Sequence, residues 1–567
     1  MSPSRSRAVA LVGRVAAALL ILAAVLALTW WGTGTPRAVS RDVAPTAVPA
    51  PAAGIVYACP AAPNNTIGGV DIDETSGSTV ITALDPDSTL SYAAATGTTA
   101  EATPEATAEA TAGASAGATA EATPGATAGA TAEATAGASA GASAGATAGA
   151  TAEASAGAAA GPTAVSAELG GSTTMDSATG GILTVQASGG TPTGAVGVVT
   201  TVTAGGDLRG LTVAPCAAPT SVAWIVGGSA AIGSSSELRL TNPGITTVTA
   251  TIHLYGSTGE LTLPASGQVS VGAGETVGVL LETASALDDR LALSVEAEGG
   301  SLIPVLVTES LDGETPAGVD TLTAGAAPAT EQAIPGVVLV DAAAQGETEA
   351  ESGAVSSEGP AVRVVNPGAA PATVSISLIG ADDEEELPGA TAATVDPGAV
   401  FDFSLAGVSP GAYAVRVSAD APVGAAVRLV RSAGEYPDRS GALAHDIAWV
   451  QAAVDAAEGA ALALPRGAGL ETSLVLTNTA QTAASLTLAS ADGQWTQDVE
   501  VPAATTLTPE VPQDVSALVI AGTGGGTVLA AAVVTTEVEG DVPGTLIAVV
   551  PTVPDAAAQG SRSLLLY

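Results

Sequence analysis

Apolar and polar residues alternate along three similar stretches of this chain. The first stretch contains Leu238-Arg239-Leu240, and after a short turn the alternation starts again. The three pairs of alternating runs are residues 236–244 and 248–256, 361–368 and 374–380, and 473–478 and 484–488. A period of two is typical of a β-strand with one buried face. The pattern therefore predicts the same two neighbouring strands three times.

An asparagine follows the first strand of each pair. The three are Asn242, Asn366 and Asn478, separated by 124 and then 112 residues. Pro-Gly follows the first two. Proline fixes φ, glycine accepts positive φ, and the asparagine side chain can satisfy backbone groups of the turn. The third copy lacks Pro-Gly, so its turn is expected to differ. The regular spacing predicts a tandem array of one module.

Further short strands complete each module. Each module is expected to open with a strand of its own, at residues 222–226, 334–340 and 447–450. About seven short strands per roughly 110 residues, with turn signals between them, favour an immunoglobulin-like sandwich. The chain is therefore predicted to be all-β, with tandem immunoglobulin-like β-sandwich modules at residues 222–333, 334–446 and 447–567.

A fourth, diverged β domain is predicted at residues 54–221. Its expected strands include residues 54–58, 182–187, 196–203 and 211–214.

An insert at residues 96–161 interrupts this domain. It consists almost entirely of Ala, Thr, Gly, Ser and Glu and has no large apolar residue, so it is predicted to be disordered. A folded domain tolerates such an insert because loop-closure entropy grows only with the logarithm of length. Two roles are open: a glycosylated tether spanning the envelope or, favoured, a neutral repeat expansion in a surface loop.

The chain has two cysteines, Cys59 and Cys216, which bracket the diverged domain. In an exported protein such a pair predicts a disulfide. Two free buried thiols are the alternative. Only His253 and His445 could join the cysteines as soft ligands, which is a poor set for a metal. No metal site and no cofactor are therefore predicted.

Residues 1–35 are predicted to be a cytoplasmic tail and a transmembrane signal anchor. Three arginines precede the segment from Val15 to Trp31, which has 17 residues and no charge. A helix of that length spans about 25 Å, just enough to cross a bilayer. A cleaved signal peptide is the alternative. Both place the bulk of the chain outside the cytoplasm, and the anchor predicts a single-pass protein of the cell membrane. Residues 36–53 are expected to form a Pro/Ala stalk.

The charge balance excludes one class of partner. The net charge is −41, there is no lysine, and from Asp42 onward 10 arginines stand against 56 acids. Such a surface repels phosphate groups, so nucleic acid is not expected as a partner. The 13 aromatic residues are also few for a surface that stacks carbohydrate.

Several short motifs occur together in this chain. They are Tyr57-Ala58-Cys59-Pro60, the stretch from Asp207 to Cys216, Trp224-Ile225-Val226-Gly227-Gly228, Leu240-Thr241-Asn242-Pro243-Gly244 and Gly318-Val319-Asp320. Together they resemble the actinobacterial membrane-anchored family known as domain of unknown function 5719. The resemblance covers residues 54–551 apart from the insert, which departs from the family pattern. It implies no assigned activity and no catalytic residues. Family members tend to be encoded near a large envelope glycosyltransferase, so the resemblance implies such an enzyme as a partner.

The sequence offers no persuasive catalytic set. The two histidines are 192 positions apart, so no Ser-His-Asp or Cys-His constellation is indicated. His253 is expected to be a satisfied strand residue. Residues 71–77 resemble the start of a calcium loop but lack its closing acid, so a solvated loop is favoured. The acidic run at residues 382–386 is expected to be a charged hairpin that discourages edge pairing. Residues 522–526 are expected to form a hairpin loop.

Three tryptophans are candidates for packing or ligand contacts. Trp224 and Trp449 lie at matching points of two predicted opening strands, which favours packing in a core or between modules. Trp495 follows Asp492-Gly493 at a predicted hairpin tip and is the candidate for contact with a ligand.

These observations favour a non-catalytic scaffold or accessory protein of the cell envelope. It would be a rod-like extracytoplasmic array whose modules serve protein–protein interaction. Its expected partner is an envelope membrane protein such as a glycosyltransferase. The alternative is a protein that binds envelope polysaccharide, with Trp495 as a contact, and an enzyme is the least favoured class.

Overall fold

The computed structural model divides the chain into two units, Met1–Ala50 with Arg562–Tyr567, and Pro51–Ser561. It describes Leu22 and Ala23 of the first unit. In the second unit it describes residues 55–63, 66–67, 70–71, 73, 75–84, 88–94, 96–98, 163–166, 172–175, 180–187, 194–341, 359–435, 443–454, 456–467, 469–540 and 542–553.

Several predicted segments fall largely outside this part of the chain. They are the anchor, apart from Leu22 and Ala23, the stalk at residues 36–53, and insert residues 99–161. Among the residues that are described, no helix combines the length and apolar character needed to cross a membrane.

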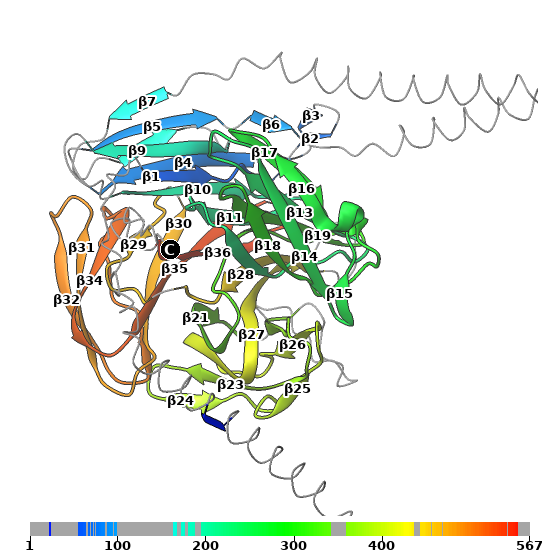
Figure 1. Ribbon diagram of the computed structural model, residues 1–567. Coiled ribbons are helices and arrows are strands. Elements are labelled where there is room, and N and C mark those ends of the chain that lie inside the picture. Colours follow the sequence, from blue (N-terminus) through cyan, green and yellow to red (C-terminus); the bar gives the residue numbers. More distant parts are fainter. Residues whose placement is uncertain are drawn as a thin grey trace, which may run out of the picture. The chain divides into compact units, whose positions relative to one another are not determined.

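The fold is all-β, as predicted, and its strands form several sheets (Figure 1). The N-terminal region has two four-stranded sheets, ordered β1-β9-β5-β7 and β11-β10-β4-β8. Its strands are β1 (Ile55–Cys59), β2 (Thr66–Ile67), β3 (Val70–Asp71), β4 (Thr75–Ala83), β5 (Ser88–Ala94), β6 (Thr96–Thr98), β7 (Thr163–Ser166), β8 (Ser172–Met175), β9 (Gly181–Ala187), β10 (Ala195–Thr203) and β11 (Gly210–Pro215).

The predicted disulfide between Cys59 and Cys216 is present. Both cysteines are buried in one core with Tyr57, Leu90 and Leu183. The bond therefore ties the first strand of this region to the end of its last strand. One boundary of the predicted insert is wrong, because its first three residues form β6, which pairs with β17 in parallel. Strand pairing uses backbone groups, so these small residues can add a strand without a core of their own.

Residues 222–333 also form two sheets, ordered β12-β18-β14-β15, with β16 on β14, and β20-β19-β13-β17-β6. Their elements are β12 (Val222–Val226), β13 (Ser234–Thr241), β14 (Val248–Gly256), β15 (Gly259–Leu261), η1 (Pro264–Gly267), β16 (Gln268–Val271), β17 (Glu275–Leu280), η2 (Leu281–Thr283), β18 (Ala292–Glu298), β19 (Ile303–Asp312), β20 (Thr315–Thr323) and β21 (Ala329–Leu339), which leads into the next repeat. Strand β13 buries Leu238 and Leu240, as its alternation predicts.

The second repeat contains one strand that takes part in two sheets. The first half of β27 pairs with β21 and β23, and its second half pairs with β22 and β28. The strands of this repeat are β22 (Ala361–Val365), β23 (Ala372–Ile379), β24 (Glu384–Glu386), β25 (Ala393–Val395), β26 (Val400–Ser404), β27 (Gly411–Glu435) and β28 (Leu443–Gln451). The acidic run forms β24, a hairpin strand at a sheet end, as predicted.

The third repeat has the sheet β29-β34-β31-β32 and the strand series β36-β35-β30-β33. Its strands are β29 (Ala461–Ala463), β30 (Leu470–Asn478), β31 (Ala484–Ser490), β32 (Thr496–Val501), β33 (Thr505–Leu507), β34 (Ala517–Gly525), β35 (Val528–Val538) and β36 (Gly544–Pro551). The hairpin predicted at residues 522–526 is wrong, because most of these residues extend β34, and β34 and β35 lie in separate sheets.

The strand predicted to open the third repeat closes the second. Strand β28 pairs with the end of β27, as β20 pairs with β19 and β36 pairs with β35. An apolar strand has the same sequence pattern in either role, so the pattern could not separate them. The boundaries at 333/334 and 446/447 fall inside β21 and β28, and the module limits stay predictions.

The closing strands contact one another. Strand β11 contacts β20, β20 contacts β28, β28 contacts β36, and β36 contacts β11. The expected rod-like array is therefore wrong, because in a rod only consecutive modules would meet. The hydrophobic cores also extend from one region to another, since Val196 and Leu211 of the N-terminal region share a hydrophobic cluster with Leu474 and Leu546 of the third repeat.

Candidate functional site

The three asparagines are buried and form nearly identical turns. Each Nδ2 donates to the carbonyl four residues later and to a more distant strand, as Asn242 does to Thr246 and Val271 at 2.8 and 3.0 Å. Each Oδ1 accepts from the backbone N–H two residues later, at 2.9 Å from Gly244. Asn366 repeats these bonds, and so does Asn478, with Ala480 N–H as donor at 3.0 Å. The expectation that the third turn differs is wrong, because any residue except proline can supply this backbone donor.

A buried carboxyl group, Asp446, lies where three closing strands meet. Its Oδ2 accepts hydrogen bonds from Leu211 N–H in β11 at 3.3 Å and from Ile547 N–H in β36 at 2.7 Å. Burial raises the pKa of Asp446 to about 8, and the bond from Ile547 and the charge of Arg209 only partly oppose this. Asp446 is therefore mostly protonated at neutral pH.

Asp320 in β20 links the next pair of closing strands. Its Oδ2 accepts a hydrogen bond from the backbone N–H of Trp449 in β28 at 2.6 Å, and its Oδ1 accepts one from the backbone N–H of Thr321 at 2.7 Å. Burial raises the pKa of Asp320 to about 7 despite these two hydrogen bonds. The two aspartates together join all four closing strands.

Arg209 lies beside Asp446 and is fully buried. Its Nε donates to the carbonyl of Val542 at 3.3 Å. Its two Nη atoms and Asp446 Oδ1 have no hydrogen-bond partner among the described residues. Burial lowers the pKa of this guanidinium, and Asp446 opposes that shift.

A second polar junction joins repeats 1 and 2 through Arg363. Its Nε and Nη2 donate to the two carboxylate oxygens of Asp402 at 2.8 and 2.9 Å. Its Nη1 donates to the carbonyl of Gly228 at 2.6 Å, and its guanidinium lies 4.6 Å from the ring centre of Trp449. Burial is the largest single influence and would raise the pKa of Asp402, but the charge and hydrogen bonds of Arg363, together with the charges of Arg428 and Arg290, outweigh it and the pKa is lowered. The predicted packing role of Trp449 is confirmed.

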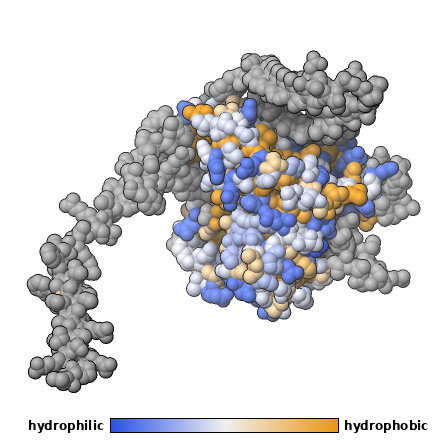
Figure 2. Space-filling model, turned by 45° about the vertical axis from the view of Figure 1, so that its right-hand side comes forward, coloured by the Kyte–Doolittle hydropathy of each residue, from blue (hydrophilic) through white to orange (hydrophobic). Residues whose placement is uncertain are grey.

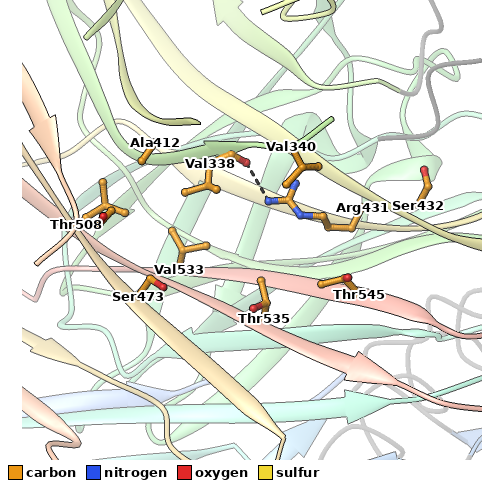
Figure 3. A pocket seen from close by; sticks show the side chains of 11 residues that line it. Val338, Val340, Ala412, Arg431, Ser432, Ser473, Thr508, Val533, Thr535 and Thr545 are labelled. Carbon is orange, nitrogen blue, oxygen red and sulfur yellow. Dashed lines mark hydrogen bonds between the residues drawn. The ribbon is translucent and has the colours of Figure 1, made fainter. Parts of the chain in front are cut away.

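A pocket of about 340 Å³ opens between the second and third repeats (Figure 3). Arg431 and Ser432 of β27 line it together with residues of β30, β35 and β36. The local sequence pattern does not indicate Arg431 or the pocket, because both depend on how β27 meets the third repeat.

Ser432, which lines the pocket, lies against a histidine that the sequence did not connect with it. Ser432 Oγ lies 3.0 Å from His445 Nδ1, across the paired strands β27 and β28. Burial lowers the pKa of His445, and Asp312 opposes the shift. No carboxylate of the described residues forms an ion pair with His445. Recognising that β27 and β28 pair would have revealed this contact.

The remaining sequence candidates lie apart from these junctions. Trp495 is half-buried against the core of the third repeat, and its backbone N–H donates to Ser490 Oγ at 3.0 Å. His253 Nδ1 of β14 lies 2.8 Å from Glu260 Oε1, and both side chains are exposed. Asp73, in the candidate calcium loop, accepts from Leu208 N–H at 2.8 Å. The described residues contain no group of three or more metal-ligating side chains.

Comparison with known proteins gives a family but no activity. No curated protein and no solved structure matches the chain. One family model, described as a family of unknown function (DUF5719), matches residues 171–512, which is more than half of the sequence. This match includes the three asparagine turns, Arg209, Arg363 and Asp446. The chain belongs to the DUF5719 family.

Proposed function

We propose that this protein is a non-catalytic scaffold or accessory protein of the cell envelope. In this proposal its β regions are tandem immunoglobulin-like modules held outside the cytoplasm by a single N-terminal anchor. The partner is an envelope membrane protein such as a glycosyltransferase, bound through module surfaces.

The observation that carries the proposal is a set of hydrogen bonds between side chains of one region and backbone groups of another. Arg363 reaches Gly228, Asp446 reaches Leu211 and Ile547, and Arg416 Nη2 donates to the carbonyl of Thr479 at 2.6 Å. Thr506 Oγ1 donates to the carbonyl of Ile379 at 2.7 Å. Such contacts fix the modules in one arrangement, which is what a platform for a partner needs.

Exposed aliphatic residues of the first repeat supply a surface for that partner. Ile232 is 92% exposed and Leu287 is 58% exposed, and their loops are joined by a 2.7 Å bond from Ala230 N–H to the carbonyl of Asp288. Figure 2 shows apolar residues in small groups among hydrophilic ones. An interface that forms reversibly is about as apolar as the rest of a protein surface, so exposed aliphatic residues among polar ones are compatible with such an interface.

The test is in-cell crosslinking of the tagged full-length protein, followed by mass spectrometry of what co-purifies from the membrane. The proposal expects one dominant envelope membrane protein, whose yield falls in Ile232→Asp/Leu287→Asp. Val454→Asp is the matched control, because Val454 is 59% exposed in the loop before β29. Recovery of envelope glycan without a protein partner would contradict the proposal.

A further inference from the structure

The pocket between the second and third repeats has a cation at its base and an open mouth. The side chain of Arg431 is buried, with 4% of the residue exposed, whereas Ser473 and Thr508 are exposed at the rim. In Figure 3 the guanidinium of Arg431 lies between Val338 and Val340. A volume of about 340 Å³ is within the range of sites that take small molecules.

Arg431 brings a positive charge into this pocket, and burial lowers its pKa to about 10 although the charge of Asp446 opposes that shift. Its Nη1 donates to the carbonyl of Val430 at 2.9 Å and its Nη2 to that of Val338 at 3.0 Å. No carboxylate of the described residues forms an ion pair with it. Its cross-strand neighbour Asp446 is mostly protonated at neutral pH. A guanidinium has five N–H donors, so two carbonyl bonds leave donors and charge for another group.

The rest of the lining combines hydroxyl groups with aliphatic side chains. The hydroxyls belong to Ser432, Ser473, Thr508, Thr535 and Thr545. Ser432 is bonded to His445 and Thr545 donates to Glu537, but a hydroxyl that donates one hydrogen bond can still accept another. Val338 and Val340 are partly exposed and add apolar surface that suits the C–H face of a ring. We propose that this pocket binds a small hydroxylated carboxylate, such as a uronic acid, with the carboxylate on Arg431. The site is independent of the scaffold role.

The test is titration calorimetry of the full-length protein with D-glucuronate and with D-glucose, which has a hydroxymethyl group in place of the carboxylate. A ligand of about 13 non-hydrogen atoms with average efficiency should bind with a dissociation constant on the order of 1 mM. Glucose should bind at least about tenfold more weakly, because it cannot pair with the guanidinium. Equal binding of the two sugars, or no glucuronate binding at about 20 mM, would overturn the proposal.

Two variants locate the site. Arg431→Met should abolish glucuronate binding. Ser473→Trp should also abolish it by filling the mouth, and this variant leaves Arg431 in place should the methionine variant fail to fold. Thr258→Trp, on an exposed turn of the first repeat, is the control and should bind as the unaltered protein does. Unchanged binding by Ser473→Trp would place the ligand elsewhere and overturn the proposal.

Discussion

Asp402 and Asp446 are both carboxyl groups at module junctions, and their pKa values shift in opposite directions. Asp402 accepts two hydrogen bonds from the Arg363 guanidinium, at 2.8 and 2.9 Å, and its pKa is lowered. Asp446 accepts two backbone N–H groups, and its pKa is raised to about 8. Arg209 is near Asp446 but forms no hydrogen bond with it in the described structure.

The difference shows what is needed to keep a buried carboxylate ionised. Backbone N–H donors stabilise the charge only in part, because they carry partial charges, whereas a guanidinium brings a full opposite charge and two aligned bonds. The Arg363 junction is therefore an ion pair at neutral pH. The Asp446 junction is a neutral link between strands, and pH can change it.

The largest expected effect is that of removing Arg363. Arg363→Met leaves Asp402 in a partly buried place without its counter-ion and also removes the contact with Trp449. The free energy of unfolding should fall by about 3–5 kcal/mol, as for other broken buried pairs. Chemical denaturation of the full-length protein measures it. Adding Asp402→Asn should recover part of the loss, and the absence of any recovery would contradict the ion-pair interpretation.

The second prediction concerns pH and Asp446. An aspartate in the unfolded chain has a pKa of about 3.9, and the folded value is about 8. Between these values unfolding releases a proton, so rising pH favours the unfolded chain. The stabilising contribution is complete below about pH 4 and is lost as the pH rises through 8, by up to about 1.4 kcal/mol per pH unit.

Asp446→Asn removes this titration. The amide oxygen can still accept both N–H groups, since Oδ2 alone accepts them in the unaltered protein. The stability of the variant relative to the unaltered protein should therefore rise between pH 6 and pH 8, by about 2–3 kcal/mol. Denaturation at several pH values checks it, and parallel curves for the two proteins would refute the neutral junction.

A smaller effect is expected for Asp320→Asn. Both oxygens of Asp320 accept backbone N–H groups, one each, whereas only one oxygen of Asp446 does so. An amide nitrogen cannot accept, so one buried N–H loses its partner at a cost of about 1–2 kcal/mol. The measurement is denaturation at pH 5, where both carboxyl groups are mostly protonated. Asp446→Asn is the control at that pH and should change stability less.

The sequence predicted the parts of this fold that local pattern determines. Alternation located β13, β22 and β30, and the asparagine turns follow from residue chemistry within a few positions. The disulfide follows from the presence of two cysteines in a chain that is predicted to be exported. The role of β28 was missed because an apolar strand has one pattern whether it opens or closes a module. The junction of Arg209, Asp320 and Asp446 could not be predicted, since these residues meet only after four distant strands pack together.

The smallest effect is expected for Trp495, in the β31–β32 hairpin, which carries none of the junction residues. Trp495→Ala should cost about 1 kcal/mol, because the ring is only half-buried. The hairpin keeps the bond from Ser490 N–H to the carbonyl of Trp495 at 2.9 Å. The pH dependence of unfolding should stay that of the unaltered protein, and so should retention on isolated envelope polysaccharide in a pelleting assay. Trp495→Phe is the control, because it keeps an aromatic ring at this position. If the alanine variant alone loses retention, Trp495 is a contact residue for polysaccharide, as the binding alternative requires. The junctions would then hold the modules that position this residue.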